Sequence, residues 1–237
     1  MTSIVKISTK EHVIEQVKWK CKVYNSMFST VIIVHFIFGL LTFYNGSANR
    51  WGGSSSLEIQ ESIYGLEFVF IVSIFMLFLL GWSLAAKPFL NQSYSIPNTN
   101  VQETVSSFIL LILLALYTIV SALCTTVILF FIKILLDDKG IKLFQLGIDP
   151  SILFLFFIVI LLASTVGYFL KSLYDVSKVG FIAVLGVFAL LAIQVEDFFV
   201  FLFTTDVGTI NMRSLFYLII LWGLTIICRK QNEVIRR

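Results

Sequence analysis

Residues 107–132 read SFILLILLALYTIVSALCTTVILFFI and contain no charged side chain. A helix rises about 1.5 Å per residue, so this stretch is longer than the roughly 30 Å hydrocarbon core of a bilayer. Lipid offers no hydrogen-bond partner to a free backbone amide, which makes a helix the expected conformation. The stretch therefore predicts a transmembrane helix, and it determines how the rest of the chain is interpreted.

Five further apolar stretches predict the remaining membrane spans, at residues 27–44, 63–86, 152–170, 179–195 and 212–228. Hydrophobic residues make up 58% of the 237 residues and charged residues only 13%, which is too little charge to cover a soluble domain. The expected fold is an all-α integral membrane protein. It has six transmembrane helices in a single transmembrane domain over residues 1–237, with an amphipathic interfacial helix at the N-terminus.

The basic residues predict the orientation of the spans. Twelve of the 17 Lys and Arg residues fall in the two termini and in the loops after the second and fourth spans. Cytoplasmic segments carry such an excess, so both termini are expected in the cytoplasm. The net charge of +3 is spread along these segments. This distribution favours membrane lipid as a partner and gives no indication of nucleic acid.

Residues 1–26 are predicted to form an amphipathic helix along the inner membrane surface. Ser8 and Glu11 fit a capping box at its start. Apolar residues then recur at helical spacing, at Val13, Val17, Cys21, Tyr24 and Phe28. Three lysines fall mostly on other faces, namely Lys18, Lys20 and Lys22. The helix is either a surface anchor or a platform that also binds a cytosolic partner.

Two segments between the spans carry further expectations. In the loop at 87–106, Pro97 disfavours helix before it, and Asn100 with Glu103 provides a cap for a short helix running into residues 107–132. That pattern also fits an ordinary polar loop. Residues 196–205 interrupt and then resume the apolar sequence. They are expected to form a short re-entrant or interfacial helix, or to extend the fifth span.

Ionisable residues inside the spans are candidates for function. Glu67 lies about four residues from the outer end of its span, where it is either hydrated at the interface or lines a substrate or proton route. His35 lies near mid-membrane, roughly 8 Å from Glu67 in depth, so the two are not expected to pair. A neutral, hydrogen-bonded histidine is the favoured interpretation.

Small and hydroxyl-bearing residues mark faces where helices meet. Tyr117, Ser121 and Thr125 share one face of their helix, and Ala163 and Gly167 are four residues apart on the next. Such residues allow close helix packing and hydrogen bonding. The alternative for the first group is a polar lining of a translocation path.

No motif predicts catalysis or a bound cofactor. The chain contains no phosphate-binding loop, no His-Glu-x-x-His pair and no Gly-x-Ser-x-Gly elbow. Its three cysteines are scattered and it has two histidines, which gives no metal-ligand spacing. We expect no enzyme and no catalytic, cofactor or metal site, so nucleotide hydrolysis would need another chain.

The order of these elements resembles the permease subunits of type-2 ATP-binding-cassette exporters. Three segments carry the resemblance: the N-terminal helix at 9–25, the sequence SIPNTNVQET at 95–104, and EDFFVFLF at 196–203. The likeness covers nearly the full chain and rests on layout and on the Ile-Pro-polar pattern. Members of that family place a contact helix between spans two and three, and re-entrant helices before span six.

The resemblance implies a partnership with two cytosolic ATP-binding subunits, which hold ATP and magnesium, and with a second permease chain. Residues implied in the ATPase contact are Val13, Val17, Asn100, Val101, Gln102 and Glu103. Residues for a translocation path are Glu67, His35, Tyr117, Ser121 and Thr125. The cargo would be hydrophobic or amphipathic, such as an antimicrobial peptide or a drug. A non-transporting membrane scaffold or sensor is the alternative, and a membrane enzyme is a third.

Overall fold

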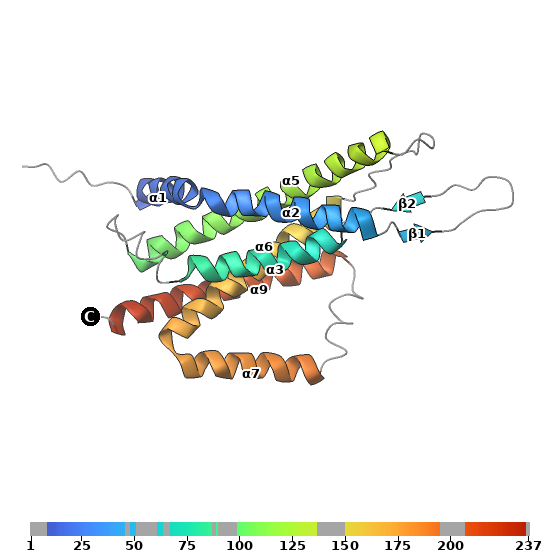
Figure 1. Cartoon of the computed structure of the whole chain (residues 1–237). Coiled ribbons are helices and arrows are strands. Elements are labelled where there is room, and N and C mark those ends of the chain that lie inside the picture. Colours follow the sequence, from blue (N-terminus) through green and yellow to red (C-terminus); the bar gives the residue numbers. More distant parts are fainter. Residues whose placement is uncertain are drawn as a thin grey trace, which may run out of the picture.

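The computed structural model describes residues 9–45, 48–50, 61–63, 67–86, 89, 99–136, 150–194 and 207–235. Seven helices dominate this part of the chain: α1 (Thr9–Val23), α2 (Asn25–Asn45), α3 (Glu67–Leu84), α5 (Asn100–Leu136), α6 (Pro150–Val176), α7 (Lys178–Gln194) and α9 (Val207–Ile235). Two short strands, β1 (Ala48–Arg50) and β2 (Glu61–Ile63), form an antiparallel ribbon in which Arg50 lies opposite Glu61. The ribbon projects from one end of the molecule (Figure 1).

Each of the six predicted spans falls on a helix of its own. The stretch at 107–132 lies inside α5, which extends beyond it at both ends. One boundary was wrong. The predicted span at 63–86 starts too early, because Ile63 belongs to β2 and α3 begins only at Glu67. The predicted re-entrant segment at 196–205 lies outside the described residues.

Two helices of the described chain are long and apolar enough to cross a membrane, at Asn100–Leu129 and Leu153–Val176. A third is added if Lys10–Val23 and Asn25–Leu41, which are bent by 52° relative to each other, form one span. The apolar part of α3, Val69–Leu84, is shorter. The described part of the chain is thus mostly helical, with two or three helices of membrane-spanning length and composition.

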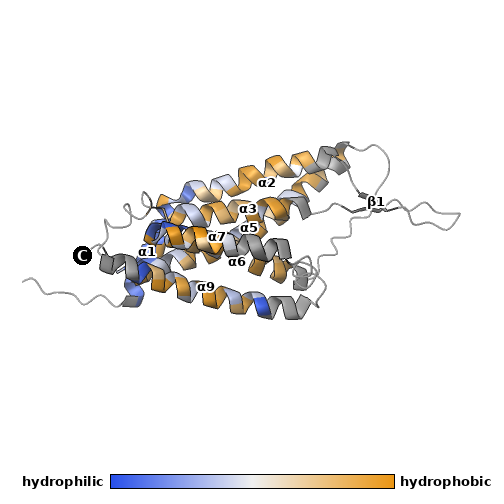
Figure 2. Cartoon of the chain, turned by 90° about the horizontal axis from the view of Figure 1, so that it is seen from below, coloured by the Kyte–Doolittle hydropathy of each residue, from blue (hydrophilic) through white to orange (hydrophobic). Residues whose placement is uncertain are grey.

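The polar residues gather at one end of the bundle. Figure 2 shows hydrophilic colour concentrated around α1 and mostly hydrophobic colour along the other helices, with one hydrophilic stretch on α9 towards the opposite end. The C-terminal end of α9 lies at this same end (Figures 1 and 2). α1 and the C-terminal end of α9 therefore lie at the same end of the bundle.

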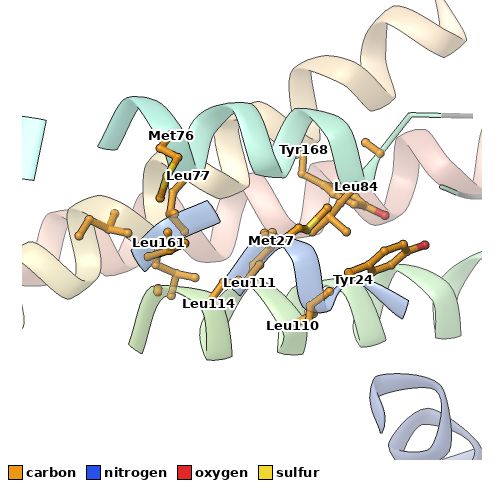
Figure 3. Packing of buried hydrophobic residues seen from close by; sticks show 14 of the residues in the cluster. Tyr24, Met27, Met76, Leu77, Leu84, Leu110, Leu111, Leu114, Leu161 and Tyr168 are labelled. Atoms are coloured by element: carbon orange, nitrogen blue, oxygen red, sulfur yellow. The ribbon is translucent and has the colours of Figure 1, made fainter. Parts of the chain in front are cut away.

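The interior is aliphatic where α3, α5 and α6 meet. Leu77, Leu110 and Leu114 are fully buried there, and Figure 3 shows them interleaved with Met27 and Leu161. Outward faces remain apolar as well: Ile71 on α3 is 63% exposed and Ile219 on α9 is 63% exposed. Apolar residues on both the inside and the outside are expected where the surrounding solvent is lipid.

The closest helix contact joins α3 to α6. A Cβ atom on Gly81 would collide with the backbone oxygen of Ser164, and one on Gly167 would collide with that of Phe78. Sequence analysis placed Gly167 at a helix contact, and the structure confirms that position. Glycine is required because the two backbones touch, which is how small residues act between membrane helices. By contrast, α7 stands apart from the bundle in Figure 1 and packs chiefly on α6.

Candidate functional site

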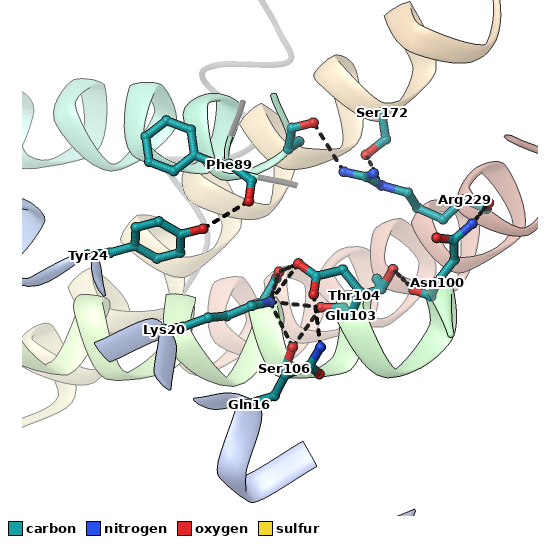
Figure 4. Close-up of polar contacts among 12 residues, drawn as sticks. Gln16, Lys20, Tyr24, Phe89, Asn100, Glu103, Thr104, Ser106, Ser172 and Arg229 are labelled. Carbon is teal, nitrogen blue, oxygen red and sulfur yellow. Dashed lines mark hydrogen bonds and ion pairs between the residues drawn. The ribbon is translucent and has the colours of Figure 1, made fainter. Parts of the chain in front are cut away.

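A buried ion pair fastens α1 to the start of α5. Lys20 is 1% exposed, and its Nζ lies 2.7 Å from Oε1 of Glu103. The same ammonium donates to the hydroxyl oxygens of Ser106 and Ser107, each at 2.7 Å (Figure 4). The sequence placed Lys20 mostly away from the apolar face of its helix. That expectation was wrong, because a counter-charge on another helix compensates the cost of burying the amine.

The carboxylate of this pair is also fully engaged. Gln16 Nε2 donates to Glu103 Oε2 at 3.2 Å, and the Ser107 hydroxyl donates to Oε1 at 3.3 Å. The backbone oxygen of Glu103 accepts from Lys20 at 3.2 Å and from the Ser106 hydroxyl at 2.9 Å. A buried ion pair is tolerated when further hydrogen bonds satisfy its remaining atoms, and that condition is met here.

The cap of α5 lies one residue earlier than predicted. The Gln102 amide donates to Thr99 Oγ1 at 3.3 Å, and the Thr99 amide donates to Gln102 Oε1 at 3.1 Å. This reciprocal capping box replaces the predicted pairing of Asn100 with Glu103. Because Gln102 supplies the cap, the side chain of Glu103 is available to face the interior and bind Lys20.

A second buried cation joins three helices at the same end. Arg229 on α9 is 5% exposed; its Nε donates to Ser172 Oγ at 3.1 Å and its Nη2 to the Ala85 oxygen at 3.2 Å. Its guanidinium lies 5.2 Å from the centre of the Tyr168 ring. Asn100 Nδ2 in turn donates to the Arg229 backbone oxygen at 3.3 Å. The first turn of α5 is thus connected to α9 as well as to α1.

Tyr24 occupies the bend between α1 and α2. Its hydroxyl donates to the Phe89 backbone oxygen at 3.0 Å, and its ring packs on Phe89 and Trp19. Burial raises the pKa of this phenol to about 12, with the negative charge of Glu103 adding to the shift. The hydroxyl is therefore a stable donor that holds the bend against Phe89, which follows α3 in the chain.

The electrostatics of the polar end couple these groups. Burial lowers the pKa of the Lys20 ammonium, Glu103 opposes that shift, and the positive charge of Arg229 reinforces it. The charge on Lys20 thus depends on its carboxylate partner. We name this set the polar-end cluster and define it as Gln16, Lys20, Glu103, Ser106, Ser107 and Arg229.

The predicted ATPase-contact residues differ in exposure. Val101 is 41% exposed, whereas Glu103 is 3% exposed within the polar-end cluster. Val13, Val17, Asn100 and Gln102 are half-buried. Of the six, Val101 offers the largest free surface, and the exposed Ile14 lies beside Val13 on α1. Glu103 has an internal partner.

The predicted path residue His35 lies in a hydrogen-bonded contact among α2, α3 and α5. Its Nδ1 is 3.0 Å from Ser121 Oγ, and its Nε2 is 2.9 Å from Ser73 Oγ. The Ser73 hydroxyl donates to the Val69 oxygen at 2.6 Å, so its oxygen accepts from Nε2–H. Ser121 then donates to Nδ1. This pattern describes a neutral imidazole with both nitrogens satisfied.

Sequence reasoning missed Ser73, although a signal was present. Ser73 is the one polar residue between Val69 and Leu80, so it was a candidate partner for His35. What the sequence lacks is the register that brings α2 and α3 together.

The other path candidates lie in helix contacts or outside the described side chains. Thr125 is 5% exposed and donates to the Ser121 backbone oxygen at 2.9 Å. The Tyr117 ring packs edge-on against Phe28, with centroids 5.1 Å apart. Glu67 begins α3, but its side chain is not among those described. Of the five candidates, the structure brings together His35 and Ser121, with Thr125 one turn further along α5.

No metal cluster exists in the described part of the chain, where no three His, Cys, Asp or Glu side chains lie close enough to share an ion. The described cysteines Cys21, Cys124 and Cys228 are all free thiols. The polar groups present bind helices to one another.

Comparison with known proteins adds no assignment, since no family model, no curated protein and no solved structure matches this chain.

Proposed function

We propose that this protein is the permease subunit of an ATP-driven exporter, with ATP hydrolysis supplied by a separate cytosolic subunit. The observation that supports it is the buried Lys20–Glu103 ion pair, which attaches α1 to the first turn of α5. Both segments are those that the sequence resemblance assigns to contact with the ATPase. Because the two segments are joined, a movement of the ATPase at this end of the bundle would act on both helices together.

The length of α5 suits it to carry a displacement. It is continuous over 37 residues and begins directly after the segment that would meet the ATPase. A push on its first turn would move α1 through Glu103 and α9 through Asn100. Packed elements of this kind change between discrete arrangements and do not deform continuously. ATP binding and hydrolysis would drive the change only by favouring one arrangement over the other.

The proposal extends to the membrane arrangement. Six helices cross a bacterial cell membrane, both termini are cytoplasmic, and a second permease chain completes the conduit. The apolar outer and inner faces suit a hydrophobic or amphipathic cargo, such as an antimicrobial peptide or a drug. The ATP and magnesium reside on the partner subunit.

The contact with the ATPase would centre on Val101, which is 41% exposed, and on α1 beside Ile14, which is 44% exposed. Apolar residues exposed at the polar end of the bundle are candidates for burial against another protein. The remaining implied residues support this patch from half-buried positions, and Glu103 acts from inside by holding α1 in place.

The test is reconstitution with the co-purified ATPase. Val101→Asp should lower substrate-stimulated hydrolysis and transport by at least about tenfold, the loss expected for placing a charge in an apolar contact. Val101→Ala serves as the matched comparison, because it shortens the same side chain without adding a charge. Unchanged coupling in Val101→Asp would contradict the assigned contact. ATPase binding without any substrate movement would favour a scaffold or sensor.

A further inference from the structure

The buried charges at the polar end do not balance. Lys20 and Arg229 are 1% and 5% exposed, and Glu103, at 3%, is the carboxylate buried between them. That carboxylate is committed to Lys20 at 2.7 Å. Within the described part of the chain no carboxylate lies within ion-pair distance of Arg229. Among the residues that the structure describes, one buried positive charge is therefore left without a full counter-charge.

The guanidinium of Arg229 donates its hydrogen bonds to neutral acceptors, which agrees with this lack of a counter-charge. Its Nε and Nη2 donate to neutral oxygens, on Ser172 and Ala85. Its Nη1 makes no hydrogen bond to the residues that the structure describes. The C-terminal end of α3 contributes only about half an elementary negative charge. A buried cation usually costs stability unless an anion accompanies it, so an anionic ligand would be favoured here.

The exposed apolar and aromatic side chains around the polar end, where Arg229 lies, indicate the source of the anion. Ile227, on the same helix, is 57% exposed, and Val179 at the start of α7 is 78% exposed. Trp82 and Tyr174 lie at this level with Lys171, whose Nζ is 4.7 Å from the Tyr174 ring. Aromatic and basic side chains next to exposed apolar surface are typical of a lipid headgroup region.

We propose that Arg229 forms a binding site for a phosphate group, supplied by the headgroup of an anionic lipid, between the ends of α3, α6 and α9. The planar guanidinium suits phosphate oxygens, because Nη1 and an adjacent N–H can donate side by side. The Ser172 hydroxyl holds the guanidinium in place and the Ala85 oxygen fixes its plane. Figure 4 shows Arg229 with Ser172.

The experiment compares lipid retention by the purified full chain in nanodiscs of phosphatidylcholine with and without phosphatidylglycerol, read by native mass spectrometry. The wild type should retain phosphatidylglycerol selectively. R229Q should lower that retention by about tenfold, the loss of roughly one charge-assisted hydrogen bond. K230Q removes the same charge from the next residue, which is exposed, and should change retention less than about twofold.

Two further arms keep the proposal open to refutation. If R229Q fails to fold, R229K keeps the charge and loses the planar fork, and it should still retain less phosphatidylglycerol than K230Q. Inorganic phosphate is added to phosphatidylcholine nanodiscs in parallel. If phosphate alone binds and displaces the lipid, the phosphate site stands and the lipid source is overturned. Equal retention in wild type, R229Q and R229K, with no phosphate binding, overturns the site and points to an acidic side chain of a partner protein.

Discussion

At the polar end, the described residues include two buried cations, Lys20 and Arg229, and one buried carboxylate, Glu103. Glu103 compensates Lys20 directly, and three further side chains, Gln16, Ser106 and Ser107, form hydrogen bonds with the pair. A buried ion pair contributes little net stability compared with apolar residues of the same shape. Replacing only one of the two charged residues is costly, because the other charge stays buried without a partner.

Glu103→Gln should destabilise the fold by about 3–5 kcal/mol, because it leaves the Lys20 ammonium buried without a counter-charge. Thermal unfolding of the purified protein in detergent measures the effect. The double variant Lys20→Met/Glu103→Leu replaces both charges with apolar side chains and should recover most of the loss. A single-variant cost below about 1 kcal/mol would show that water reaches the pair in solution.

The Tyr24 phenol should titrate near pH 12, whereas its ordinary pKa is 10.0. The folded-state pKa is raised, so the stabilisation from this group is complete below pH 10 and is lost as the pH rises towards 12. The difference in phenolate absorbance between the wild type and Tyr24→Phe isolates this residue from the other tyrosines. A difference curve with its midpoint at pH 10 would contradict the burial of the hydroxyl.

At the scale of elements, the apolar runs predicted where each helix lies, because lipid-length hydrophobic stretches leave few alternatives. They did not predict which polar residues turn inwards. The local cap pattern at Asn100 and Glu103 was one residue out of register, since Thr99 and Gln102 form the cap. Lys20 and Ser73 acquire their roles only from partners on other helices, and that information is tertiary.

Gly167→Ala should destabilise the α3–α6 contact by about 1–3 kcal/mol or more, because the added methyl group meets backbone and cannot be relieved by a rotamer change. Gly186→Ala is the matched control. It is also helical, and a Cβ there has nothing within 4 Å, so it should be neutral or stabilising by up to about 1 kcal/mol. Chemical unfolding curves for the two variants test the contrast. Equal behaviour would mean that the two helices separate readily.

For the whole molecule, the decisive geometry is that α1 and the end of α9 lie on one side (Figure 1). The distribution of Lys and Arg predicts that both termini are cytoplasmic, and that orientation stays a prediction. The compartment that this side faces depends on the positive-inside rule.

Epitope tags at the two termini should respond identically to protease in sealed, oriented vesicles. Both tags should be cut in inside-out vesicles and both protected in right-side-out vesicles. Detergent-permeabilised vesicles, in which both are cut, provide the control for tag accessibility. Cleavage of one tag alone would refute the shared side and the even number of crossings.

The glycine-mediated contact between α3 and α6 restricts where anything could travel through this protein. With Gly81 and Gly167 bringing main chain against main chain, the two helices form a sealed seam, and not even a water molecule fits between them at those positions. If the proposed transport function holds, a moving solute would have to pass somewhere other than between these two helices at Gly81 and Gly167.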